Sequence, residues 1–348
     1  MIATGGTAGH VVPALAVAGA LRAEGAEVAF IGGERVEAQL VPAAGFQFHA
    51  ISVEGLNRSN PLQAARALAR AVVAVLRARS LLSRLGPDAV MGGGGYVAGP
   101  VGLAALTLRI PLVLTEADSH LGLTNRVLAP AARRVCLSFP LAGRDGSRYR
   151  VTGRPVPAPA SDRGRARERF GIAAGETCVL VFGGSLGARS INLAAIDAFA
   201  EMAVRVVHVC GSRDHAELAA RRLPPGYDLR EYLDLVEFAD ALAAADLVVA
   251  RAGGSIFEIA AHGAPAILIP YPRASADHQT ANASWMERAG AATVIADGEL
   301  TAERLEREVT RLLTDRSLLA AMASASRRLA RPQAAHEVAA ELLRAAGG

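Results

Sequence analysis

Residues 1–18 read MIATGGTAGHVVPALAVA, and residues 178–195 read CVLVFGGSLGARSINLAA. In each stretch a short apolar run leads into Gly-Gly-[Ser/Thr]-x-Gly and then into a segment whose apolar residues recur at helical spacing. A glycine-rich turn between a strand and a helix lets backbone N–H groups approach an anion, and the helix dipole favours negative charge there. Either copy alone also fits tight strand–helix packing. The pair predicts two phosphate-binding loops that open onto a shared crevice between two domains.

Strand-like apolar runs alternate with helical patterns along most of the chain, which indicates parallel sheets covered by helices. The strand candidates are EVAFIG, DAVMGG, PLVLTE, RVCLSF, CVLVFG, VRVVHVCG, DLVVAR and PAILIP. At 348 residues the chain exceeds what one core usually supports. We therefore predict the α/β class with two Rossmann-like, doubly wound domains. A proline-rich, charged segment at 151–171 suggests an N-terminal domain over 1–153 and a C-terminal domain over 154–320, followed by a helix over 321–348 that packs back on the first.

The first strand is unusual for this class, since only residues 1–4 precede the first glycine loop. The first strand of a doubly wound sheet is normally central and longer. We expect a short strand here, with neighbouring backbone groups partly unpaired if the chain start lies inside it.

Composition restricts the partners and the compartment. All 37 basic residues are arginine, which we attribute to genomic base composition and do not take as a sign of nucleic-acid binding. No nucleic-acid partner is expected. The widely spaced Cys136, Cys178 and Cys210 fit neither a disulfide framework nor a zinc site and indicate a reducing compartment. There is no signal peptide and no uninterrupted apolar stretch of spanning length, which predicts a cytoplasmic protein unless it lies on a membrane surface.

Two side chains next to glycine turns are candidates for chemistry. His10 directly follows the first loop, where an imidazole could act as a general base near neutral pH, or simply bond to backbone at a helix start. Glu258 begins a helical pattern after Gly253 and Gly254. Its carboxylate could accept ribose hydroxyls, or stabilise the helix dipole.

Six motifs occur in an order that resembles the MurG family of glycosyltransferases, within glycosyltransferase family 28. They are TGGTAGHVVPALAVA (4–18), GGGGYVAGP (92–100), GLTNR (122–126), FGGSLGARSIN (182–192), ARAGGSIFEIAAHGAPAILIPY (250–271) and DHQTANA (277–283). The resemblance spans about residues 1–345 and implies the GT-B fold, in which two Rossmann-like domains face each other across a cleft. It also implies inverting transfer of GlcNAc from UDP-GlcNAc to the 4-hydroxyl of undecaprenyl-diphospho-MurNAc-pentapeptide, in peptidoglycan synthesis. No metal, cofactor or covalent intermediate is expected.

The resemblance assigns roles residue by residue. Its catalytic candidates are His10, with Glu116 as the reserve base. The expected donor-binding residues are Thr7, Ala8, Gly9, Asp118, Arg154, Gly184, Ser185, Leu233, Gly254, Ser255, Ile256, Phe257, Glu258 and Gln279. The expected acceptor-binding residues are Thr7, Gly9, Tyr96, Thr124 and Asn125, although Tyr96 could equally pack on a glycine turn.

Three departures from the family pattern keep other functions open. Asp118 replaces a neutral amide, and Pro157 replaces an arginine whose charge we expect Arg154 to supply from a shifted position. The segment 251–258 is one residue shorter than usual. The alternatives are a UDP-GlcNAc 2-epimerase, which shares the two-domain architecture, and a non-catalytic relative that binds sugar nucleotide or lipid. The acceptor motifs favour transfer over epimerisation.

Residues 61–85, PLQAARALARAVVAVLRARSLLSRL, mix Leu and Val with arginines at 66, 70, 77, 79 and 84. A basic amphipathic helix can lie in an anionic bilayer interface, although a helix on an ordinary domain surface has the same pattern. Together with a lipid-linked acceptor, this segment predicts peripheral attachment to the anionic cytoplasmic face of the cell membrane.

Overall fold

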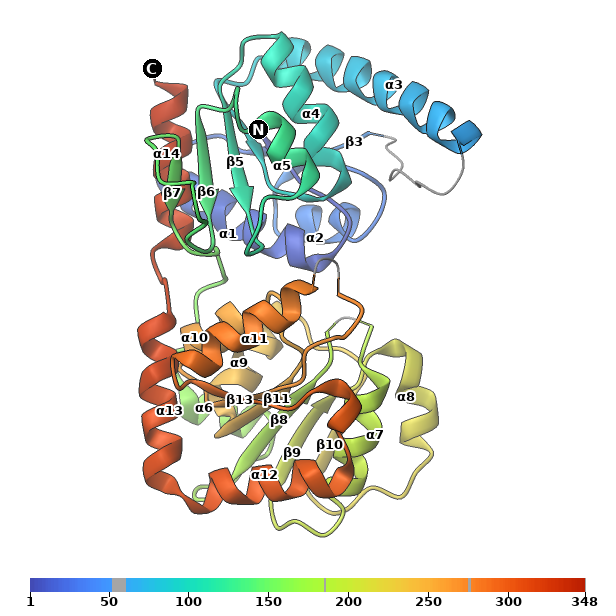
Figure 1. Cartoon of the computed structure of the whole chain (residues 1–348), viewed down its shortest axis with the longest axis vertical. Helices are drawn as coiled ribbons and strands as arrows, with labels where there is room; N and C mark the ends of the chain where they lie inside the picture. Colours follow the sequence, from blue (N-terminus) through green and yellow to red (C-terminus); the bar gives the residue numbers. More distant parts are fainter. Residues whose placement is uncertain (52–60, 185, 275–276, 348) are drawn as a thin grey trace. The chain divides into compact units, whose positions relative to one another are not determined.

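The structure is a computed structural model that describes residues 1–51, 61–184, 186–274 and 277–347, without the side chains of 61–71. It divides into two compact units, Met1–Val156 with Arg331–Gly348, and Pro157–Ala330. From the sequence we placed these junctions at 153/154 and 320/321. Each unit is built on one parallel sheet covered by helices, so the predicted α/β class with two Rossmann-like sheets is confirmed (Figure 1).

The sheet of the first unit has the strand order β3-β2-β1-β4-β5-β6-β7, and every pair is parallel. The strands are β1 (Ile2–Ala3), β2 (Ala29–Gly32), β3 (Gln47–Ala50), β4 (Val90–Gly92), β5 (Leu112–Glu116), β6 (Arg134–Leu137) and β7 (Tyr149–Val151). The helices are α1 (Ala8–Ala23), α2 (Glu37–Ala43), α3 (Pro61–Leu85), α4 (Gly95–Thr107), α5 (Leu123–Leu128) and α14 (Ala334–Ala346). The core side chains of α3, α4 and α5 form one cluster with the sheet, and those of α1 and α14 form another, so the two sets of helices cover opposite faces.

Strand β1 is central and only two residues long, as expected. The groups beside it are paired, however, so the expectation of partly unpaired neighbours is wrong for these groups. The Met1 ammonium donates to the Ala89 carbonyl (3.0 Å), and the amides of Met91 and Gly93 donate to the carbonyls of Met1 and Ala3.

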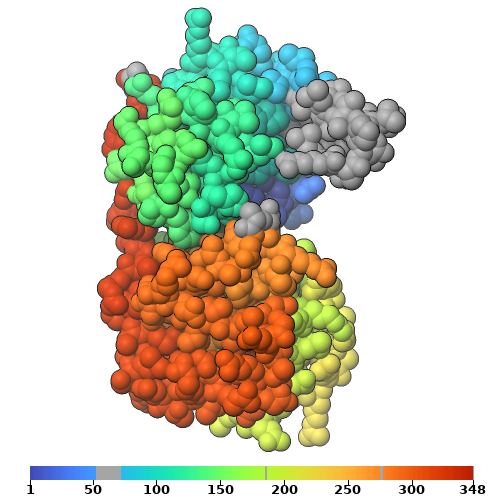
Figure 2. Space-filling view, viewed as in Figure 1, coloured from blue at the N-terminus to red at the C-terminus, as the bar shows by residue number. Residues whose placement is uncertain are grey.

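The sheet of the second unit has the order β10-β9-β8-β11-β12-β13, again all parallel. The strands are β8 (Cys178–Phe182), β9 (Arg205–Val209), β10 (Tyr227–Arg230), β11 (Leu247–Ala250), β12 (Ala266–Leu268) and β13 (Ala292–Val294). The helices are α6 (Arg163–Arg169), α7 (Arg189–Ala198), α8 (Ser212–Ala219), α9 (Leu235–Ala244), α10 (Ile256–His262), α11 (His278–Arg288), the short 3-10 helix η2 (Asp297–Glu299), α12 (Ala302–Thr314) and α13 (Arg316–Leu329). Residues from α11 to α13, coloured orange to red, form most of the visible surface of this unit (Figure 2).

Helix α14 belongs to the first unit although it ends the chain. Its buried Val338 and Leu342 join the same core cluster as α1. Its buried carboxylate, Glu341, accepts hydrogen bonds from Arg134 of β6 (2.8 Å) and Arg150 of β7 (2.9 Å). Burial alone would raise the pKa of Glu341, but the bonds and charges of Arg134 and Arg344 lower it. The end of the chain is therefore held by apolar packing and by a charged anchor.

Candidate functional site

Both glycine loops lie at the carboxyl ends of central strands. The first connects β1 to α1 and the second connects β8 to α7, so the predicted strand–turn–helix context is confirmed twice. In each sheet the strand before the loop pairs with a strand much later in the sequence, β4 in one unit and β11 in the other. Open α/β sheets bind ligands outside the carboxyl ends of strands at such switch points.

A buried carboxylate that we did not predict supports the first loop. Glu37, the first residue of α2, is fully buried and accepts hydrogen bonds from the amides of Gly6 and Gly33, both 3.0 Å. Burial would raise the pKa of Glu37, but these bonds and one from Tyr96 lower it. The Gly6 amide is therefore already paired. An external anion would meet the amides in the first turn of α1, at Ala8 and Gly9, which helical geometry leaves without a partner.

Tyr96 belongs to this support. Its hydroxyl donates to Glu37 (2.9 Å), and its ring lies against Gly6, where an added Cβ would be 3.6 Å from the ring. Burial and the nearby carboxylate raise the pKa of Tyr96 to about 12. The structure therefore shows the packing on a glycine turn that we weighed against acceptor binding.

His10 is held in the first turn of α1 by two neighbours. Its ring packs against Gly94, where a Cβ would lie 2.6 Å from the ring. Its Nδ1 is 3.3 Å from the hydroxyl of Thr7, the residue that precedes α1. Burial, and then the charge of Arg154, lower the pKa of His10, while Asp118 and Glu37 act in the opposite direction. The imidazole is therefore neutral near pH 7 and able to accept a proton.

Arg154 and Asp118 lie at this first loop. The buried Arg154 guanidinium donates to the carbonyl of Gly9. The half-buried Asp118 is near enough to His10 to affect its titration. The structure thus places both of these expected donor-binding residues in the first unit, whereas the second glycine loop is in the other.

The loop after β5 is organised around Glu116. This buried carboxylate accepts the amides of Asp118 (3.1 Å) and Gly122 (2.9 Å) and the side-chain NH₂ of Asn125 (2.9 Å). Asn125 also donates to the Thr115 carbonyl, so its NH₂ group holds the loop. Thr124 lies against Gly99 of α4. These contacts favour a structural role for Glu116 over that of a reserve base.

In the second loop, Gly184 and Gly187 have positive φ angles of 96° and 75°. An added Cβ at Gly187 would lie 1.8 Å from the Cys210 carbonyl, so only glycine allows the loop to pack on the end of β9. At Gly184 a Cβ would meet nothing within 4 Å among the described residues, so this side of the loop faces open space. Ser185, our expected phosphate ligand, lies outside the described residues.

The other expected donor residues of the second unit lie at the carboxyl edge of the same sheet. Gly254 and Ser255 precede α10, and the buried Ile256 and Phe257 and the half-buried Glu258 form its first turn. The carbonyl of the Gln279 side chain accepts the Tyr271 amide (2.9 Å), and its NH₂ group is 3.8 Å from where a Cβ of Gly253 would be.

Leu233 is buried between β10 and α9, two places from β8 in the sheet. Because Leu233 follows the carboxyl end of β10, its backbone lies at the same edge of the sheet as the second glycine loop.

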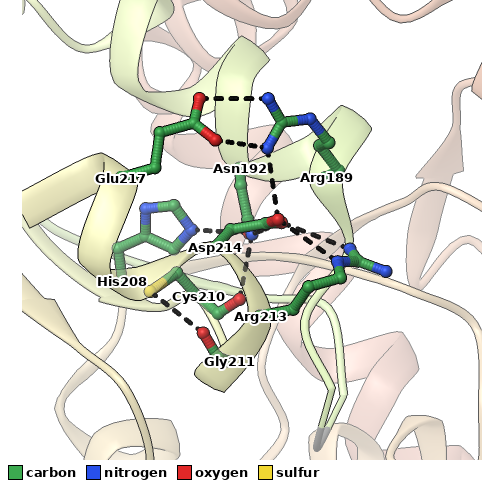
Figure 3. Close-up of polar contacts among 8 residues, drawn as sticks. All are labelled: Arg189, Asn192, His208, Cys210, Gly211, Arg213, Asp214 and Glu217. Atoms are coloured by element: carbon green, nitrogen blue, oxygen red, sulfur yellow. Dashed lines mark hydrogen bonds and ion pairs between the residues drawn. The ribbon is translucent and has the colours of Figure 1, made fainter.

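A buried polar network, which we did not predict, joins α7 to the turn after β9 (Figure 3). Asn192 of α7 donates to the Cys210 carbonyl (2.9 Å) and to Asp214 (2.8 Å), and its oxygen is 3.1 Å from His208 Nε2. A carbonyl oxygen only accepts, so this nitrogen carries the proton, and His208 Nδ1 accepts from the Tyr227 hydroxyl (2.7 Å). Burial lowers the pKa of His208 to about 3, which keeps the network uncharged at that point.

Arg251 makes a second connection to α7. This buried guanidinium donates to Asp297 (2.5 Å) and to Ser190 (2.9 Å), and so ties the end of β11 to the start of α7. The sequence offered weak signals for these groups, namely a histidine within an apolar strand and an arginine directly after one. Neither signal identifies a partner.

The three cysteines are buried and free. Burial raises the pKa of Cys136 and of Cys178 to about 12 each, and that of Cys210 to about 11, so all three remain thiols. Within the part of the chain that the structure describes, no three His, Cys, Asp or Glu side chains are grouped to hold a metal ion.

Comparison with known proteins agrees with this two-part geometry. Residues 1–137 match the glycosyltransferase family 28 N-terminal domain, and residues 178–338 match the C-terminal domain of the same family. A curated relative from Acidithiobacillus ferrooxidans is 42% identical over 100% of this chain and 98% of its own. It is named UDP-N-acetylglucosamine–N-acetylmuramyl-(pentapeptide) pyrophosphoryl-undecaprenol N-acetylglucosamine transferase.

Solved structures give the same result for the fold. The crystal structure of Acinetobacter baumannii MurG superimposes with a TM-score of 0.76 at 31% identity, covering 99% of this chain and 98% of that one. A putative UDP-N-acetylglucosamine 2-epimerase from Listeria monocytogenes has a TM-score of 0.72 at 16% identity, covering 97% and 94%. The second likeness shows a shared fold alone. The expected family resemblance and GT-B fold class are confirmed.

Proposed function

The chain belongs to glycosyltransferase family 28, and from this premise we propose that it transfers N-acetylglucosamine from UDP-N-acetylglucosamine to the 4-hydroxyl of undecaprenyl-diphospho-N-acetylmuramoyl-pentapeptide. The observation that carries the proposal is the 42% identity, over the whole chain, to a curated relative named for this transfer. The two glycine loops support it, because each presents a helix N-terminus to a phosphate-bearing ligand.

We assign the proton transfer to His10. Its lowered pKa keeps the imidazole neutral, so it can take the proton of the acceptor hydroxyl as that oxygen attacks the anomeric carbon of the donor sugar. The bond from the anomeric carbon to the UDP oxygen breaks in the same step, and the configuration inverts. Glu116 is less suited to this task because three hydrogen bonds within its own loop already occupy its carboxylate.

The second unit would hold the donor. The N-terminus of α7 and the open side of Gly184 suit the diphosphate, whose negative charge grows as UDP leaves. Glu258 would accept the ribose hydroxyls, and the NH₂ group of Gln279 would face the sugar beside Gly253. Backbone at Leu233 and at residues 254–257 would contact the nucleoside.

The first unit would hold the lipid-linked acceptor. The first-turn amides of α1 suit its diphosphate, and Thr7, Thr124 and Arg154 lie near this loop or on the neighbouring α5. Tyr96 and Asn125 would act indirectly, because each uses its polar group to support a loop.

We also propose peripheral attachment at the cytoplasmic face of the cell membrane, through helices α3, α4 and α5, of which α4 packs against both of the others (Figure 1). Among the described side chains of these helices, the large apolar ones that are exposed are Val72, Val73, Leu76, Leu85, Leu103, Leu123 and Val127. Arginines 77, 79 and 84 of α3 accompany them, whereas Arg66 and Arg70 are among the undescribed side chains. No helix in the described ranges is long and apolar enough to cross a bilayer. Flotation with vesicles should require anionic lipid, and equal flotation with neutral vesicles would contradict the attachment.

One turnover experiment separates the candidate functions. UDP-GlcNAc incubated with the purified chain should yield UDP only when the lipid-diphosphate acceptor is present. Appearance of the 2-epimer without acceptor would indicate an epimerase. Donor binding without turnover under either condition would indicate a non-catalytic relative.

A further inference from the structure

A cavity of about 620 Å³ lies at the amino-terminal edge of the first unit's sheet, against the ends of α4 and α14. Four arginines line it, Arg109, Arg133, Arg134 and Arg148, and among the described residues that form its wall none is acidic. The first glycine loop follows β1, at the carboxyl edge of the same sheet. The cavity is therefore separate from the candidate transferase site.

The topology of the sheet explains why these arginines gather. Strands β5, β6 and β7 are parallel neighbours, so the residues before each strand meet at one edge. Arg133 directly precedes β6, and its amide donates to the Leu112 carbonyl of β5 (2.8 Å). Arg148 directly precedes β7, and its carbonyl accepts the amide of Val135 of β6 (2.8 Å). The backbone thus fixes where these two side chains begin.

Charge at this edge is unbalanced. Arg134 is paired with Glu341 (2.8 Å), whose carboxylate also binds Arg150. Arg109, Arg133 and Arg148 are exposed, and within the described parts of the chain no carboxylate bonds to them. Guanidinium groups match the oxygens of phosphate groups and bind them in bidentate fashion.

Arg109 also occupies a backbone position that favours glycine. Its φ is +59°, and in the described ranges only Asp277 shares a positive φ among residues other than glycine. Helices usually end with glycine in this left-handed conformation because a Cβ carries a steric cost there. The amides of Arg109 and Ile110 donate to the carbonyls of Leu106 and Ala105, so this conformation ends α4. It also places Arg109 among the residues that line the cavity.

We propose that this arginine cavity is an anion site that takes a phosphate group, presented either by a lipid headgroup or as free phosphate. Its volume falls within the range of about 300–1,000 Å³ typical of small-molecule sites. Helix α3 reaches the same region, since Arg79 donates to Thr107 near the end of α4 (2.9 Å). The cavity thus adjoins the helices proposed to face a membrane, and phosphate binding there does not depend on sugar transfer.

The test compares the parent chain with a triple variant, Arg109→Gly, Arg133→Gln and Arg148→Gln. A matched control removes three exposed arginines of the second unit, through Arg222→Gln, Arg288→Gln and Arg316→Gln. One arm titrates inorganic phosphate by calorimetry at low ionic strength. The other measures co-sedimentation with phosphatidylcholine vesicles, with and without phosphatidylglycerol.

In the phosphate arm, the triple variant should lose about tenfold or more in affinity while the control keeps it. If the triple variant loses binding only to the vesicles that contain phosphatidylglycerol, the phosphate group that the site takes belongs to a lipid headgroup. If the parent binds neither probe, or if the triple variant behaves as the control does with both, the proposal is overturned.

The single variant Arg109→Gly separates binding from a structural role. Glycine relieves the left-handed strain, so the midpoint of thermal unfolding should hold or rise while phosphate affinity falls. A lower midpoint of thermal unfolding would mean that Arg109 stabilises the fold, and this would count against its role in the anion site. Transfer to a soluble acceptor analogue should be unchanged, so failure of the anion site and failure of the proposed transfer remain distinguishable.

Discussion

At the scale of single residues, one buried and one half-buried ionisable group set the properties of the first glycine loop. Glu37 supplies an internal negative charge to the amides of Gly6 and Gly33, and His10 presents a neutral imidazole beside the loop. One group fixes the backbone and the other remains available for chemistry.

We predict that His10→Gln lowers kcat by about 10²- to 10⁴-fold and leaves the KM for UDP-GlcNAc nearly unchanged, because only the proton acceptor is lost. The pH profile of kcat/KM in the parent should reflect the lowered pKa of His10. A base must be unprotonated, so activity should fall only as the pH drops through a value below the ordinary histidine pKa of about 6.5. If the pH profile of kcat/KM in His10→Gln still falls at low pH as in the parent, another residue is the base. The same measurement on Glu116→Gln tests whether Glu116 is that residue.

Glu37→Gln should destabilise the chain by about 1–3 kcal/mol, because the buried Gly33 amide and the half-buried Gly6 amide lose a charged partner. A carboxyl with a lowered pKa stabilises the fold above its unfolded pKa of about 4.3. Its contribution is lost as the pH falls through the lower, folded value. Thermal unfolding at neutral and acidic pH measures this, with exposed Glu34→Gln as control. Equal effects of the two variants would contradict the role.

At the scale of elements, α7 is attached to its surroundings at two points beside the second loop. Asn192 attaches it to the turn after β9, and Arg251 attaches its start to the end of β11. A helix whose N-terminus receives a diphosphate must be fixed before the ligand arrives, since ordering it later would reduce affinity.

We therefore expect Asn192→Ala to raise the KM for UDP-GlcNAc more than it lowers kcat. It should also cost about 1–3 kcal/mol of stability, because the Cys210 carbonyl and His208 lose their partner. Steady-state kinetics and denaturant unfolding measure the two effects. Glu217→Gln, which alters only an exposed pair with Arg189, should change neither. A loss of stability with an unchanged KM would limit the network to folding.

The elements also show how far sequence reasoning reaches. All eight strands that we proposed from apolar runs are present, and β1 was expected to be short. The strands that we missed, β3, β7, β10 and β13, are the four sheet edges. Edge strands have one free side and carry polar residues, as in YRV and YDLR, so they lack the continuous apolar signal of central strands.

The same limit applies to the site. His10 and Gly184 could be proposed because they lie within or beside a glycine turn that identifies itself in the sequence. Glu37 and Asn192 could not, because Gly6 is 31 residues from Glu37 and Asp214 is 22 residues from Asn192, and these pairs meet only after folding.

At the scale of the whole molecule, the first unit is assembled from both ends of the chain, with α14 completing the core around α1. We predict that Leu342→Ala costs about 2–5 kcal/mol of unfolding free energy, because this buried side chain fills the α14 face of that core. The adjacent Leu343 is 38% exposed, so Leu343→Ala should cost far less. Thermal or denaturant unfolding of the two variants decides the point, and similar losses would mean that α14 is only loosely docked.

Because α14 packs in the first unit but follows the second unit in the sequence, the second unit can complete its fold first during synthesis. Domains generally fold as units while the chain is being synthesised, the N-terminal one first. Here the half that emerges first lacks α14 until residues 334–346 have been synthesised, and until then it exposes the apolar side chains of α1 that Val338 and Leu342 will cover. The half encoded in the middle can reach its native state earlier. A nascent chain that has not yet reached residue 334 therefore carries an incomplete first unit whose apolar core residues are exposed.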